Sequence, residues 1–119
     1  MKGERKMFRR KYEITLNRVH DKITVREGEE RLELTVDEDP GRIISGLNKA
    51  QKMLQNITEE TPEDERKRAA LFFAETLFGA AQAEKLMAFY QADALAVISI
   101  CGNYFRERLS KLIVKAQKK

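Results

Sequence analysis

The residues best equipped for chemistry are carboxylates, and they gather in two runs of the 119-residue chain. The first run spans Asp37 to Asp39 and is followed by Pro40. Acidic loops can hold Ca²⁺, but the alternating oxygen ligands and the terminal glutamate of a calcium loop do not occur here. A carboxylate before a proline is typical of a helix start, where it caps free amides and faces the positive end of the helix dipole. We therefore interpret this run as structural.

The second acidic run could be mistaken for a pair of catalytic carboxylates. Its members are Glu59, Glu60, Glu63, Asp64 and Glu65. An acid and base pair needs two carboxyl groups whose pKa values are split by different surroundings, such as an apolar pocket on one side. These acids are nearly contiguous at an exposed helix start, for which we expect Thr61 to be the cap. The run predicts a solvated surface.

Two single residues, His20 and Cys101, also have reactive side chains. His20 has no second ligand or nucleophile near it, so we expect a surface histidine in a turn. Cys101 cannot form an internal disulfide, because it is the one cysteine of the chain, and it lies on an apolar helix face. We expect a buried thiol there. The sequence thus predicts no catalytic, cofactor-binding or metal-binding residue and a protein that is not an enzyme.

The net charge of +4 is distributed unevenly along the chain. The first eleven and the last fourteen residues each carry about +5, which leaves about −6 for the middle. Basic ends can neutralise phosphates, so a nucleic-acid-binding regulator is one alternative. It is the weaker one, because no aromatic residues are interleaved with these charges as a base-stacking surface requires. A solvated arm and a basic last helical turn explain the same charges.

The elements that would position these residues follow from two hydrophobic periods. With 42% hydrophobic and 35% charged residues, the chain has the composition of one soluble domain, which we place at residues 11–119 after a disordered basic arm at 1–10. Residues 11–36 alternate between apolar and polar types, with Gly28 in a polar link. We predict a three-stranded antiparallel meander there. Its inward residues are Tyr12, Ile14, Leu16, Ile23, Val25, Leu32, Leu34 and Val36.

Residues 40–119 change to the helical period, which predicts four helices packed on the apolar face of the meander and an α+β fold. We expect Gly79 to end the second helix and Asp93 to cap the long last one. On that last helix the expected core stripe is Ala94, Ile98, Cys101, Phe105, Leu109, Leu112 and Ala116. We expect Phe105 to share a core with Phe73 of the second helix.

One segment carries a resemblance to a known family. It runs through Leu77-Phe78-Gly79, Ala83-Glu84-Lys85-Leu86 and Phe89-Tyr90 to an Asp-containing turn and a long helix with a basic end. This pattern resembles small tail-assembly proteins, including tail chaperones, of phages and prophages of Gram-positive bacteria. The resemblance implies a non-enzymatic protein without a cofactor that binds the tape-measure protein or another tail component in the host cytoplasm. A structural tail component of the virion is the alternative.

The last helix also suggests a binding surface. Ile100 and Val114 lie outside its expected core stripe on one flank, with Glu107 and Lys111 between them. Two aliphatic residues on one exposed flank could line a groove for a partner helix or for a second copy of the chain. Two ordinary surface residues, or a wider core face, would give the same pattern. No apolar run reaches the roughly 20 residues of a membrane span, so we expect no membrane partner.

Overall fold

The computed structural model describes residues 18–117, and within them a two-stranded sheet is followed by four helices. The strands are β1 (Val19–Glu27) and β2 (Glu30–Glu38), and the first three helices are α2 (Pro40–Gln55), α3 (Glu63–Phe78) and α4 (Ala80–Phe89). The fourth is a continuous rod made of α5 (Ala94–Tyr104), the π-helical turn η1 (Phe105–Leu109) and α6 (Ser110–Gln117). The α+β class and the four helices are as predicted.

The two strands of the hairpin are longer than the corresponding strands of the predicted meander. β1 and β2 pair antiparallel from Val19 opposite Glu38 to Glu27 opposite Glu30, around a two-residue turn. Gly28 begins this turn with φ +63, a conformation that glycine adopts without a side-chain penalty. Two strands, not three, are present between residues 18 and 117, and the expected first strand with Tyr12, Ile14 and Leu16 lies outside the described residues.

The expected turn around His20 is wrong, because inward positions continue through this segment. Val19 and Val25 are buried, and Asp21 and Ile23 between them are partly buried, so odd-numbered residues of β1 face the helices. A charged residue, Asp21, occupies one of these inward positions, so the apolar alternation is interrupted there although the strand continues. His20 itself is exposed, as predicted.

A side chain of α4 occupies the outer edge of β2. The Gln82 amide accepts a hydrogen bond from Thr35 N (2.7 Å) and donates one to Thr35 O (2.7 Å), which are the bonds a neighbouring strand would make. The same Nε2 atom also lies 2.7 Å from Phe78 O. The edge is therefore closed by a helix at this point, and the hairpin is fastened to α4.

Most helix boundaries follow local signals. The Asp39 side chain accepts from Gly41 N, with Pro40 as the first residue of α2, and the Asp93 side chain accepts from Ala96 N at the start of α5. Gly79 ends α3 with φ +86. The prediction for Thr61 is wrong: Pro62 precedes α3 as its N-cap, and Thr61 Oγ1 instead accepts a bond from Thr58 N within the preceding turn.

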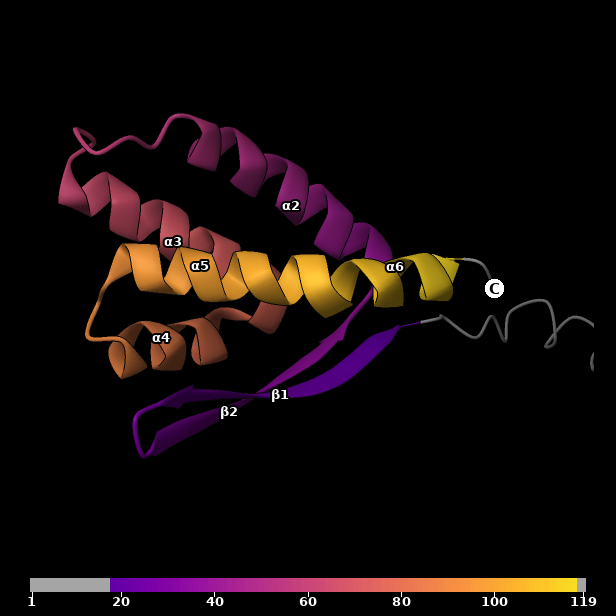
Figure 1. Ribbon diagram of the computed structural model, residues 1–119. Coiled ribbons are helices and arrows are strands. Elements are labelled where there is room, and N and C mark those ends of the chain that lie inside the picture. The colour runs from indigo at the N-terminus through magenta and orange to yellow at the C-terminus, as the bar shows by residue number, and fades with distance from the viewer. Residues whose placement is uncertain (1–17, 118–119) are drawn as a thin grey trace, which may run out of the picture.

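The long helix is the central element, with α2 on one side and the hairpin on the other (Figure 1). α3 lies beside α5 and also contacts α2 and α4. The core between these elements is apolar, and in residues 18–117 no polar or charged residue is buried as a whole, although the Asp21 side chain at its edge is only 5% exposed. Its largest fully buried side chains are Leu34, Ile43, Leu77, Leu86 and Leu109.

The π turn changes which residues of the long helix face the core. The buried residues are Ala94, Val97, Cys101, Tyr104, Leu109 and Ile113. Their spacing is three or four until Tyr104, becomes five across η1, and then returns to four. A π turn holds one extra residue, so it rotates everything after it by about 100° relative to a regular helix. The predicted stripe is therefore correct only in part: Ala94, Cys101 and Leu109 are buried, whereas Ile98, Phe105 and Leu112 are only partly buried.

Candidate functional site

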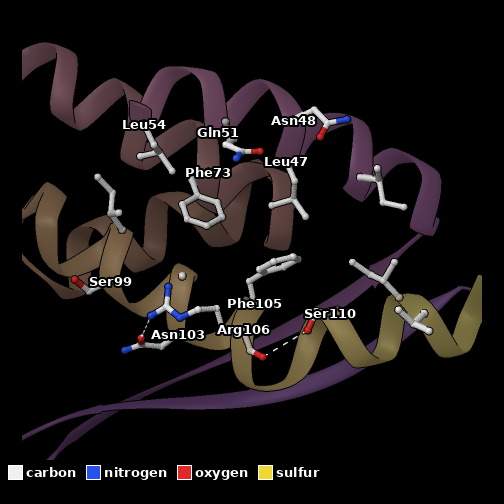
Figure 2. A pocket seen from close by; sticks show the side chains of 16 residues that line it. Leu47, Asn48, Gln51, Leu54, Phe73, Ser99, Asn103, Phe105, Arg106 and Ser110 are labelled. Carbon is white, nitrogen blue, oxygen red and sulfur yellow. Dashed lines mark hydrogen bonds between the residues drawn. The ribbon is translucent and has the colours of Figure 1, made fainter. Parts of the chain in front are cut away.

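An open apolar groove lies between α2 and the long helix. α2 begins against α6 and rises away from α5 toward its end, so the two helices diverge (Figure 1). The space between them has a volume of about 840 Å³. Figure 2 shows Leu47, Leu54, Phe73 and Phe105 directed into this space from three helices. Three further depressions of the described chain are smaller, at about 400 Å³ or less.

The α2 wall exists because this helix has two apolar stripes. One stripe, with Ile43 and Ala50, is buried in the core. Gly46 lies so close to Thr76 of α3 that an added Cβ would be 2.5 Å from Thr76 Cγ2, so α2 and α3 are in close contact. The second stripe contacts the core only at its edge and stays partly open to solvent. Its members are Ile44, Leu47 and Leu54, with Asn48 and Gln51 beside them.

The opposite wall is formed by the long helix. Phe105 is the first residue of η1, and its ring is directed into the groove near Phe73 (Figure 2). Phe73 is 6% exposed and forms the floor, as a core residue of α3 should. The expectation that both rings share one core is therefore correct only for Phe73.

The charge of the groove is positive. Arg106 is the one charged side chain among the described residues that line it, and its guanidinium donates to Asn103 Oδ1 (Figure 2). A shallow depression lined by Lys111 and Lys115 adjoins the groove at Ser110 and Val114. α2 carries Arg42, Lys49 and Lys52 and no acid.

On the hairpin side of the long helix, Asp21 forms a second polar cluster. Its carboxylate accepts a bond from Tyr104 OH (2.8 Å) and two from the Arg108 guanidinium, one of them from Nη2 at 2.7 Å. The Asp21 side chain is 5% exposed. The bonds from Arg108 lower the pKa of Asp21, whereas burial and the bond to Asp21 raise the pKa of Tyr104.

This cluster holds the fold together and has no open position for a substrate. Tyr104 and Arg108 both donate to the Asp21 carboxylate, and these bonds join β1 to the long helix across more than 80 residues of sequence. The sequence did not reveal this cluster, because the neighbouring His20 was expected to lie in a turn. Continuing the alternation of Val25 and Ile23 backward would have placed this carboxylate on the inward face.

The other candidate residues occupy structural positions. Cys101 is buried, as predicted, and burial raises the pKa of its thiol to about 12, so it stays protonated near neutral pH. His20 Nδ1 lies 3.3 Å from Asp37 Oδ1, and Arg18 Nε lies 2.8 Å from the same oxygen. In the described part of the chain, no group of three or more His, Cys, Asp or Glu residues could hold a metal ion.

The four residues of the predicted binding flank do not form one surface. Val114 is 50% exposed and lines the groove, whereas Ile100 packs against the core and does not line it. Glu107 and Lys111 are exposed. The reason is again the π turn, because the extra residue between Ile100 and Val114 rotates one away from the other.

Two further observations bear on the identity of the chain. None of the helices between residues 18 and 117 is both long and apolar enough to cross a membrane. In comparisons with known proteins, no family model matches the chain, and no curated protein or solved structure gives a significant match.

Proposed function

We propose that the protein is a non-enzymatic assembly chaperone of a phage or prophage tail, and that it holds a helical segment of the tape-measure protein or another tail component in the groove between α2 and the long helix. The observation that carries the proposal is this groove, which is apolar, open and bounded by two helices. Such grooves accept the apolar face of a partner helix. The tail context comes from the resemblance, which covers roughly residues 12–119 and is sharpest in the segment from Phe78 to Leu86 and the helix after it.

The dimensions of the groove support a helical occupant. The lining residues of the long helix extend from Ile98 to Val114, which corresponds to about 24 Å of helix axis at about 1.5 Å per residue. A helix of about four turns fits that length. Several half-buried aliphatic side chains and Phe105 contact no other element on their open side and would gain burial from such a partner.

Two tryptophan substitutions on α2 test the proposal. Gln51 and Ser45 are both exposed, but only Gln51 lines the groove. Gln51→Trp should fill the groove, whereas Ser45→Trp adds the same bulk outside it. After co-expression with the proteins encoded beside it in the tail module, Ser45→Trp should recover the client as the wild type does, and Gln51→Trp should not.

The readouts also separate a chaperone from a tail component. If Gln51→Trp is folded and recovers the same amount of client as Ser45→Trp, the groove is not the binding site. Mass spectrometry of purified particles distinguishes the two roles, because a chaperone is released and a structural component stays. A fixed copy number of this chain in the particles would replace the chaperone proposal with the structural one.

A further inference from the structure

We propose that the groove selects an acidic amphipathic helix and that Arg106 binds a carboxylate of that helix. This inference rests on the proposed function and specifies the chemistry of the partner. It starts from the surroundings of Arg106, a cationic side chain on the wall of an apolar groove (Figure 2).

The guanidinium of Arg106 has no carboxylate partner among residues 18–117. It donates to the neutral Asn103 Oδ1, and its Nη1 atom lies over Gly102, where an added Cβ would approach it to 3.3 Å. Two residues later, Arg108 is fixed by Asp21 through two bonds. Arg106 therefore keeps donors available for a bidentate bond to a carboxylate, the pairing for which a guanidinium is best suited.

The surroundings of Arg106 have the same sign. No acidic residue lines the groove within the described chain, and the adjoining depression has Lys111 and Lys115. Glu107 is the one acid in the sequence of the long helix from Ala94 to Gln117, and α2 has none. A positive potential over an apolar groove favours a partner with an apolar stripe and acidic flanks, and it disfavours a basic one.

The same charges decide between the possible occupants. Residues 1–11 of this chain carry about +5, so they would be repelled by the lysines and arginines beside the groove. A second copy would have to present an acidic amphipathic helix. Three of the four acids of α3 lie in its first turn, Glu63 to Glu65, and the fourth, Glu75, is partly buried. The apolar residues of α3 are largely buried in the core. The charge pattern therefore favours a helix from another protein.

Three synthetic peptides test this selection with the full-length chain. Each has about 16 residues, the length of the groove, with leucines at helical spacing. The flanking positions are Glu, Gln or Lys. Fluorescence anisotropy with labelled peptides gives their dissociation constants. At low salt the Glu peptide should bind about tenfold more tightly than the Gln peptide, the ratio expected of one charge-assisted pair, and the Lys peptide should bind most weakly. The preference should shrink at high salt.

Matched variants assign the preference to Arg106. Arg106→Gln should remove most of the difference between the Glu and Gln peptides. Arg26→Gln changes an exposed arginine of β1 outside the groove and should leave the difference unchanged. Gln51→Trp should weaken the binding of the Glu and Gln peptides alike, because the indole fills the apolar space that the leucine stripe of either peptide would occupy.

Four results would overturn the inference. Equal binding of the Glu and Gln peptides, with both blocked by Gln51→Trp, would mean that the groove holds helices without selecting acids, and the proposed function would stand. An acid preference that survives Arg106→Gln would assign the selection elsewhere. Dimers in light scattering that Gln51→Trp dissociates would make a second copy the occupant. Failure of every peptide to bind would reject the acidic helix, and recovery of the client would then decide the proposed function separately.

Discussion

At the scale of single residues, Asp21 has the most demanding position in the structure. A carboxylate with a 5% exposed side chain is tolerated because Tyr104 and Arg108 satisfy it, and the Arg108 bonds lower its pKa. Arg108 is 59% exposed, so the pair is screened on one side. Its contribution to stability is correspondingly moderate.

Asp21→Asn should therefore lower the free energy of unfolding by about 1–2 kcal/mol near neutral pH. Because the folded pKa lies below the roughly 3.9 of an unfolded aspartate, the pair stabilises the fold above that value and loses its effect as pH falls through the folded pKa. Denaturant titrations of both proteins should converge at low pH. Asp37→Asn is the control, since that carboxylate is 59% exposed and should matter less. A difference that is constant from neutral to acidic pH would contradict the assignment.

The two phenylalanines of the groove should respond differently to truncation. Phe73 is 6% exposed and belongs to the core, so Phe73→Ala should cost about 3–5 kcal/mol of stability. Phe105 is only partly buried on the groove wall, so Phe105→Ala should cost less than half as much stability as Phe73→Ala. The same change should weaken the binding of helical peptides to the groove. Thermal melts and anisotropy measure the two effects. Equal losses of stability would place Phe105 in the core after all.

At the scale of the elements, the contact between α2 and α3 positions one wall of the groove. It depends on Gly46, whose missing side chain leaves room for Thr76. Gly102 on α5 is a natural comparison, because an added Cβ there would approach only the flexible end of Arg106.

Gly46→Ala should destabilise the chain by about 1–3 kcal/mol, because its Cβ would overlap Thr76 Cγ2 and Oγ1. Thr76→Ala removes both atoms, so the double variant should recover much of the loss in a double-mutant cycle. Gly102→Ala should be neutral or stabilising by up to about 1 kcal/mol, since alanine favours a helix. Strictly additive effects of the first two changes would show that the helices do not meet at this point.

The π turn leads to an unusual expectation for deletions. Removing Glu107 should convert η1 to regular helix and restore a spacing of four between Tyr104 and the next core leucine, so the core register is kept. Stability should then be unchanged or higher, although Phe105 and Arg106 change their surroundings. Removing Ser99 from α5 offers no such compensation and should unfold the chain. Circular dichroism melts compare the two, and unfolding by both deletions would refute the register argument.

At the scale of the whole molecule, the hairpin is a separate layer that Gln82 and Asp21 fasten to the helices. The Gln82 amide replaces a strand at Thr35, and the Asp21 cluster reaches the long helix. Both fastenings join residues that are at least 47 positions apart in sequence.

Gln82→Ala should free the outer edge of β2 at Thr35. Hydrogen exchange of the Thr35 amide should accelerate by at least about tenfold, since its bond to Oε1 would be replaced by one to water. The amides of α3 should exchange as before. Glu84→Ala, an exposed change on the same helix, is the control. Unchanged protection of Thr35 would show that another group covers this edge.

Much of the fold could be predicted locally. Strands and helices follow from hydrophobic periods of 2 and 3.6 residues. The helix starts at Asp39 and Asp93 follow from side chains that accept bonds from nearby backbone amides, and the helix end at Gly79 follows from a residue that adopts positive φ without a side-chain penalty. The burial of Cys101 was predicted correctly for the same reason, because it follows from the apolar stripe of its own helix. These are properties of short segments, so neighbouring residues suffice to determine them.

The candidate site could not be predicted in this way. The phase of the long helix after Tyr104 depends on the π turn, and that turn keeps Leu109 and Ile113 in contact with elements far away in sequence. The groove exists because α2 diverges from α5, a relation between helices about 50 residues apart. Asp21 is bound by residues more than 80 positions later. The sequence periods thus determined which faces of the helices and strands are apolar. Only the tertiary structure decided which of these faces stay open to solvent, because an apolar face is buried only where an element distant in sequence packs against it.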